Sequence, residues 1–168
     1  DKVILKKKYI REIECMGMGL VLFKISTIDR HVGQNYHLFF ENNYKPLLDV
    51  AVNPEDGLIE YISYFIQDEK IDNMDIVPKI KNENIDIEFL KDMFINDNMN
   101  ITIKAKFKFW KFQNSIFILK ENICEFEFDA YLVDELNCML FLEDEFVGIQ
   151  FKELTIEEFK EIQNSKCL

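Results

Sequence analysis

The sequence predicts one mostly β domain over residues 1–168, either a β-sandwich or a strongly curved antiparallel sheet, with an α-helix at its C-terminal end. Three observations support this fold class. Apolar and polar residues alternate in short runs, turn signals separate the runs, and a helix-start signal follows the last run. The spacing of the turn signals predicts seven to ten strands. The alternative is an α+β arrangement with a second helix near residues 86–95.

Residues 47–66 predict a hairpin at the centre of the fold. Pro54 and Gly57 lie in the break between two apolar runs, where proline presets φ and glycine tolerates a positive φ. The second run, residues 58–66, is apolar at both alternating phases. A strand of this kind is expected to be covered on both faces, and we therefore place it centrally.

The N-terminal region contains two more strand signals. Residues 2–25 predict either one long strand kinked at Gly17 and Gly19 or two strands joined by a tight bend. Residues 36–41 predict a short strand.

Residues 67–100 carry the weakest periodic signal of the chain. Ile87, Leu90 and Phe94 are spaced like one face of a helix, so a short helix is expected near residues 86–95.

Two later runs alternate clearly. Residues 101–109 predict a strand with a basic face, formed by Lys104, Lys106 and Lys108. A following strand has an acidic face, formed by Glu125, Glu127 and Asp129. If the two strands lie close together in one sheet, the lysines are expected to face these carboxylates.

The C-terminal third predicts a hairpin followed by a helix. The hairpin turns at Glu143, Asp144 and Glu145. Thr155 and Glu158 then fit a capping box, with Thr155 at the N-cap. The helix is expected to end near residue 164 and to bury an apolar stripe formed by Ile156, Phe159 and Ile162.

Charge is the main guide to function. Thirty-one acidic residues against twenty Lys and Arg give a net charge of −11. Such a field repels nucleic acids and anionic membranes and attracts basic proteins. We expect a small acidic interaction module, an inhibitor or immunity-type protein that masks a basic partner. The predicted partner-binding residues are Glu125, Glu127, Asp129, Glu143, Asp144 and Glu145.

Two other functions are kept as alternatives. The aromatic content of 14% is compatible with a non-catalytic β-module that binds a small molecule or polymer in an aromatic-lined cleft. An enzyme without a recognisable motif is the third. No catalytic residue, cofactor or metal ligand is predicted, since His31 and His37 have no ligand-spaced partners and no glycine-rich phosphate loop is present. No motif indicates a known family.

Cysteine usage predicts a reducing, cytoplasmic location. The four cysteines are widely spread without metal-binding spacing and are expected to be free thiols. Because the chain begins at Asp1 rather than Met, an exported protein that has lost a leader is the alternative. The abundance of Ile, Lys, Asn and Phe suggests an AT-rich, bacterial genome. Nothing in the sequence indicates an oligomeric state.

Overall fold

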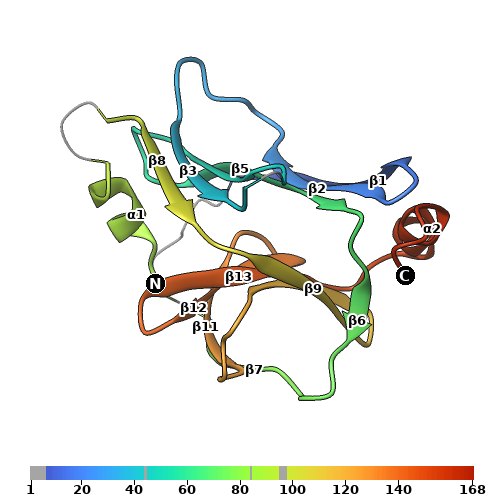
Figure 1. Cartoon of the computed structure of the whole chain (residues 1–168). Helices are drawn as coiled ribbons and strands as arrows, with labels where there is room; N and C mark the ends of the chain where they lie inside the picture. The colour runs from blue at the N-terminus through green and yellow to red at the C-terminus, as the bar shows by residue number, and fades with distance from the viewer. Residues whose placement is uncertain (1–6, 44, 84, 95–97) are drawn as a thin grey trace.

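Two β-sheets packed face to face form the protein, with one helix at each side (Figure 1). The computed structural model describes residues 7–43, 45–83, 85–94 and 98–168. It confirms the predicted β-sandwich with a C-terminal helix. Neither described helix has the length or the apolar run needed to cross a lipid bilayer.

The first sheet has six strands. In spatial order they are β1 (Tyr9–Gly17), β2 (Leu20–Thr27), β5 (Ile59–Gln67), β4 (Leu48–Val52), β3 (Tyr36–Glu41) and β8 (Asn100–Lys104). All neighbours are antiparallel except β3 and β8.

The β4–β5 hairpin confirms the predicted turn and the central position of its second strand. Gly57 has a φ of 73°, and β5 pairs with both β2 and β4. The prediction that both faces of β5 are covered is wrong. Tyr64 and Ile66 are buried, whereas Tyr61 and Phe65 on the opposite face are half-buried. Only one face of this sheet packs against the core shared with the second sheet, as in other sandwiches.

The N-terminal region forms two strands joined by a tight bend, the second of the two predicted arrangements. Gly17 and Gly19 both take a positive φ between β1 and β2. The side chain of Asp68 fills the space where a Cβ on Gly19 would lie.

The second sheet has seven strands. In spatial order they are β6 (Ile71–Asn73), β9 (Phe107–Phe112), β10 (Ser115–Lys120), β13 (Glu145–Phe151), β12 (Asn137–Leu142), β11 (Glu127–Leu132) and β7 (Lys79–Asn82). Both edge strands run parallel to their neighbours, so the sheets are mixed rather than wholly antiparallel. The thirteen described strands exceed the predicted seven to ten, partly because residues 67–100 supply the short strands β6 and β7.

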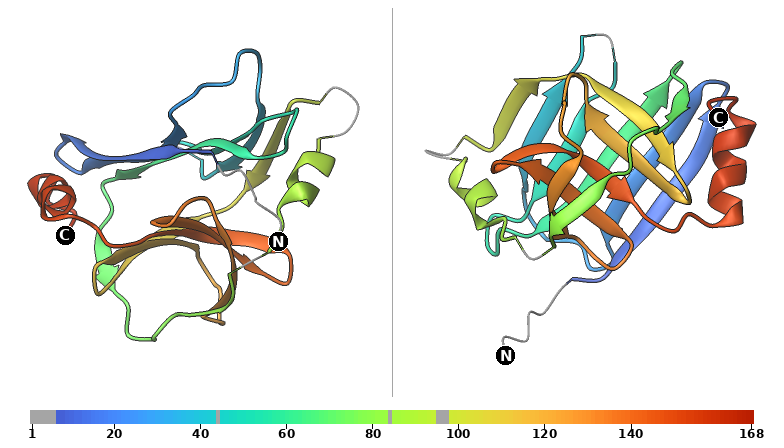
Figure 2. Two further views of the ribbon diagram at one scale, coloured as in Figure 1. Left: turned by 180° about the vertical axis from the view of Figure 1, so that it is seen from behind. Right: turned by 90° about the horizontal axis from the view of Figure 1, so that it is seen from below.

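The second sheet curls strongly, because its two edge strands follow each other in the chain. Asn73 ends β6 and Lys79 begins β7, and six residue steps span at most about 21 Å. Seven strands laid flat would separate the edges by about 29 Å. The sheet therefore bends round until its edges approach each other, as Figure 2 shows from two sides.

This curl creates two separate cores. The larger one lies between the sheets, where the Phe23 ring centroid is 5.5 Å from those of Phe109 and Phe151. The smaller one lies on the other face of the second sheet and includes Phe117 and Phe128.

The run at 101–109 is not the single strand predicted. It divides into β8 in the first sheet and β9 in the second, so the chain crosses between the layers at residues 105–106. The expected pairing of its lysines with the acidic strip is also wrong, because β10, β13 and β12 separate β9 from β11. The register instead sets Lys79 of β7 opposite Glu127, and Lys108 pairs with Asp72 at 3.6 Å.

Both helices lie where the sequence predicted them. The short α1 (Glu88–Asp92) is flanked by Ile87 and includes Leu90, and both of these side chains are buried in the larger core. The helix α2 (Ile156–Asn164) begins with the predicted capping box. The prediction that Ile156 belongs to the buried apolar stripe of α2 is wrong, because this residue is 70% exposed.

Candidate functional site

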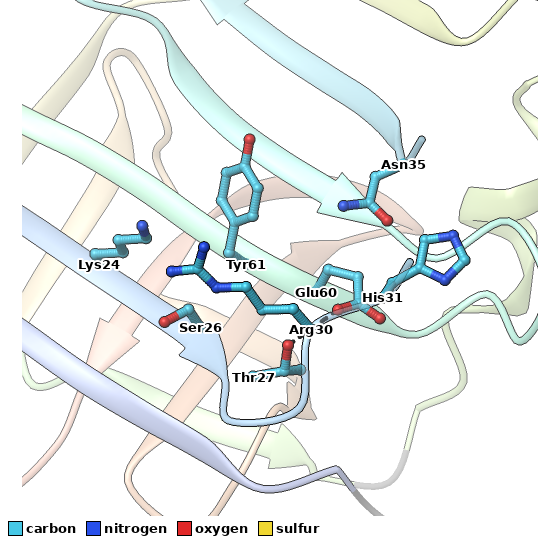
Figure 3. A pocket seen from close by; sticks show the side chains of 8 residues that line it. All are labelled: Lys24, Ser26, Thr27, Arg30, His31, Asn35, Glu60 and Tyr61. Carbon is cyan, nitrogen blue, oxygen red and sulfur yellow. Dashed lines mark hydrogen bonds between the residues drawn. The ribbon is translucent and has the colours of Figure 1, made fainter. Parts of the chain in front are cut away.

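A polar recess opens on the first sheet beneath the β2–β3 loop (Figure 3). We call it the cationic recess. Its volume is about 240 Å³, and its side chains come from β2, the loop and β5. The lining residues are Lys24, Ser26, Thr27, Arg30, His31, Asn35, Glu60 and Tyr61.

Glu60 is a buried carboxylate in the wall of this recess. It accepts hydrogen bonds from Lys7 Nζ at 2.5 Å, Thr27 Oγ1 at 2.9 Å and Asn53 Nδ2 at 2.9 Å. Burial raises the pKa of Glu60, but the hydrogen bonds from Lys7, Asn53 and Thr27 outweigh burial and lower it. Glu60 is therefore an ionised and well-satisfied group whose charge Lys7 partly offsets.

Tyr61 connects the recess to a second ionisable pair. Its hydroxyl donates to Asp49 Oδ2 at 2.6 Å, and the other carboxylate oxygen, Oδ1, is 2.8 Å from His37 Nδ1. Burial and the Asp49 carboxylate raise the pKa of Tyr61. When His37 is neutral, Nδ1 donates to Asp49 and Nε2 is the acceptor. The Nδ1 atom of His37 is thus hydrogen-bonded to Asp49.

A nucleophile hydrogen-bonded to His37 is not observed among the described residues. Nucleophilic catalysis requires a hydroxyl or thiol hydrogen-bonded to the base. Within the described ranges, no Ser, Thr or Cys side chain is hydrogen-bonded to His37. In the same part of the chain, no three His, Cys, Asp or Glu side chains converge as a metal site requires.

The structure brings most of the predicted acidic residues to one surface. Glu125 precedes β11, and together with Glu143 and Glu145 it lines one hollow. Glu127 lines the adjoining hollow with Glu125 and Glu143, and Lys79 and Lys81 line the same hollow. Asp129 is half-buried in β11 and lines neither hollow. We call Glu125, Glu127 and the turn residues 143–145 the acidic surface.

The turn at the end of β12 also forms the rim of an apolar cleft. The cleft has a volume of about 320 Å³ and lies between the two sheets and α1. Its apolar lining consists of Leu38, Phe40, Leu90, Met93, Ile103 and Phe146, and its charged lining consists of Lys120, Glu143, Asp144 and Glu145.

The geometry of this turn is that of a tight two-residue hairpin. Glu143 and Asp144 have φ values of 48° and 66°, the left-handed conformations that such a connection requires. Glu145 pairs with Lys120 at 3.0 Å. Lys120 Nζ also lies 5.5 Å from the centroid of the Phe40 ring on the floor of the cleft.

The sequence pointed to the residues of the acidic surface as two separate acidic features, and it predicted neither the recess nor the cleft. Their residues come from segments far apart in the chain, such as β2 and β5, and no fixed spacing links them. The only local signal was the polar alternation of Lys24 and Ser26 in β2. No protein-family model matches this sequence, and no curated protein matches it either.

Proposed function

We propose that the protein is an acidic interaction module that binds and masks a basic protein, in the manner of an inhibitor or immunity protein. One observation carries this proposal: the acidic turn 143–145 borders the apolar cleft. Carboxylates and an apolar floor therefore occupy one continuous surface.

This combination matches the anatomy of protein interfaces. Such interfaces have a desolvated apolar centre and a polar rim. The six apolar side chains of the cleft supply the centre, and residues 143–145 supply the rim. The complementary partner presents an aliphatic or aromatic side chain flanked by Lys or Arg. Long-range attraction by the net charge of −11 would accelerate its association.

The carboxylates of the acidic surface are available to such a partner. Among the described residues, Glu145 is the only member in an ion pair, and its side chain is 69% exposed. Glu143, Asp144 and Glu145 lie next to one another in sequence, so their charges repel. Cations brought by a partner would relieve this repulsion.

The test is calorimetric titration with purified basic proteins encoded beside this gene, at about 0.1 M and about 1 M salt. Screening shortens the Debye length from about 10 Å to about 3 Å over this range. Binding is expected at the lower salt and is expected to weaken by at least tenfold at the higher. The triple variant Glu143→Gln/Asp144→Asn/Glu145→Gln should weaken low-salt binding to a similar extent.

A matched control separates local from overall charge. Glu14→Gln/Glu135→Gln/Glu157→Gln changes the net charge equally at three residues outside the acidic surface and the cleft. It should leave affinity within about threefold of wild type. Equal losses in both triple variants, or no binding of any basic protein tested, would contradict the proposal.

The apolar floor is tested with a second pair of variants. Met93→Gln places a polar group in the cleft at a residue that is 38% exposed, and Met18→Gln does the same at a 73% exposed residue elsewhere. Only Met93→Gln should weaken binding. A purely electrostatic contact would leave both variants unchanged.

A further inference from the structure

We infer that the cationic recess binds a small hydroxylated organic anion, a molecule that carries one carboxylate or phosphate beside hydroxyl groups. The recess lies on the first sheet and shares no lining residue with the acidic surface or the apolar cleft. The inference is therefore independent of the proposed protein partner.

The positive charges of Lys24 and Arg30 have no carboxylate partner among the described residues. In the described part of the chain, neither Lys24 nor Arg30 forms an ion pair, although the protein carries eleven excess negative charges. Lys24 Nζ lies 5.5 Å from the centroid of the Tyr61 ring. Figure 3 shows Arg30 reaching across the recess toward Lys24 and Tyr61. Two cations thus converge above one concave surface.

Glu60, the carboxylate in the recess wall, does not form an ion pair with Lys24 or Arg30. Lys7, Thr27 and Asn53 already donate to its two oxygens. Lys7 offsets part of its charge, since Lys7 pairs with both Glu60 and Asp56. Among the lining residues, Lys24 and Arg30 outnumber the single carboxylate of Glu60, and an anion placed between these two cations would form charge-assisted hydrogen bonds.

Asn35 indicates the hydroxyl part of the ligand. Its Oδ1 atom is buried, and no described protein group donates a hydrogen bond to it. Buried carbonyl oxygens almost always have a donor partner. A ligand hydroxyl would supply that donor once the half-buried Asn35 side chain turns its amide oxygen toward the recess, while the charged group of the ligand lies at Arg30.

The volume limits the size of the ligand. A recess of about 240 Å³ corresponds to roughly eight water molecules of liquid volume. This space accommodates a carboxylate or phosphate with a few hydroxylated carbons. A compact metabolite-like anion matches this size.

The experiment is a titration of ¹⁵N-labelled protein followed by NMR, with four probes. Glycerate and glycerol phosphate carry both charge and hydroxyls, acetate carries only charge, and glycerol carries only hydroxyls. Saturable shifts are expected in amides of residues 24–35 and 60–61 with at least one of the first two. The better of these two identifies the carboxylate or the phosphate as the charged group. Acetate and glycerol should bind at least about tenfold more weakly, since each lacks half of the recognised groups.

Variants at exposed or half-buried positions test whether the chemical-shift changes arise from binding in the recess. Arg30→Gln should weaken binding of the preferred probe about tenfold, and Asn35→Ala should remove its advantage over acetate. Lys160→Gln on α2 makes the same charge change as Arg30→Gln away from the recess and should have no effect. Absence of saturable shifts, equal binding of glycerol and the anions, or equal binding to Arg30→Gln and wild type would overturn the inference. If Asn35→Ala still binds the preferred probe more tightly than acetate by the wild-type factor, Asn35 does not recognise the ligand hydroxyl.

Discussion

Arg11 in β1 and Glu158 in α2 form a two-point ion pair between segments 147 positions apart in the chain. Arg11 Nε donates to Glu158 Oε2 at 2.8 Å, and Nη2 donates to Oε1 at 2.8 Å. Arg11 Nη1 also donates to the carbonyl of Lys152 at 2.8 Å, and Glu158 Oε1 accepts from the Thr155 amide at 2.9 Å. One guanidinium therefore links the edge of the first sheet to the end of the second sheet and to the start of α2.

Replacing Arg11 should destabilise the whole fold. Only 7% of its side chain is exposed, so Arg11→Gln leaves the Glu158 carboxylate, the Asn137 amide oxygen and three backbone carbonyls without this donor. Breaking one side of a buried ion pair costs roughly 3 kcal/mol of unfolding free energy. Urea unfolding followed by circular dichroism measures this loss. Arg30→Gln, at an exposed position, should change stability by less than about 0.5 kcal/mol, and similar losses in the two variants would contradict a structural role for the Arg11 pair.

Glu60 should make the protein less stable in acid. The folded-state pKa of Glu60 is lowered from its ordinary 4.5, so its stabilisation is complete above about pH 4.5 and is lost as the pH falls through the folded-state pKa. Glu60→Gln loses the ion pair with Lys7 and should cost about 1–3 kcal/mol at pH 7. The difference in unfolding free energy between wild type and variant should shrink as the pH falls below 4.5. A difference that stays constant from pH 7 into this range would show that Glu60 titrates alike in the folded and unfolded chains.

Gly148 should tolerate no side chain. It lies in β13 between β10 and β12, and a Cβ there would approach the Ile118 carbonyl oxygen to 2.1 Å. Because this obstacle is backbone, Gly148→Ala must push two paired strands apart and should cost about 3 kcal/mol or more. At Gly17 a Cβ meets no atom within 4 Å, so Gly17→Ala carries only the backbone strain of its positive φ, about 1–2 kcal/mol. Thermal unfolding of both variants gives the comparison, and a smaller loss at Gly148 would mean that the strands can separate easily.

Asp49 should control the ionisation of Tyr61. Burial raises the pKa of Tyr61 above 10.0, and the hydrogen bond and negative charge of Asp49 raise it further. Asp49→Asn removes the negative charge, so the pKa of Tyr61 should fall toward 10.0. Ultraviolet difference titration of wild type against Asp49→Asn detects the change, with circular dichroism used to verify that both remain folded at each pH. Tyr61→Phe identifies the tyrosine responsible, and coincident titration curves for wild type and Asp49→Asn would refute the coupling.

Local signals identified most elements correctly because the responsible interactions are themselves local. Pro54 and Gly57 specify a turn through their own backbone preferences, and Thr155 and Glu158 satisfy each other's amides within one helical turn. Alternation likewise predicted the acidic face on which Glu127 lies, and Glu127 is exposed. These patterns depend on residues less than ten positions apart.

Long-range packing explains the incorrect predictions. The alternation at 101–109 shows which side chains are apolar but not which layer they enter, and the chain changes sheet at residues 105–106. The predicted contact between the lysines and the acidic strip is wrong for the same reason. Local periodicity contains no information about the order of strands within a sheet.

By itself, then, the sequence determined the β-rich fold class, the central hairpin, the capped C-terminal helix and the excess of negative charge. Only the tertiary structure decided that the acidic turn borders an apolar cleft and that Lys24, Arg30 and Asn35 meet in one recess. The physical reason is that secondary structure follows from the preferences of neighbouring residues. A site, in contrast, depends on the register and curvature by which distant strands bury their apolar faces.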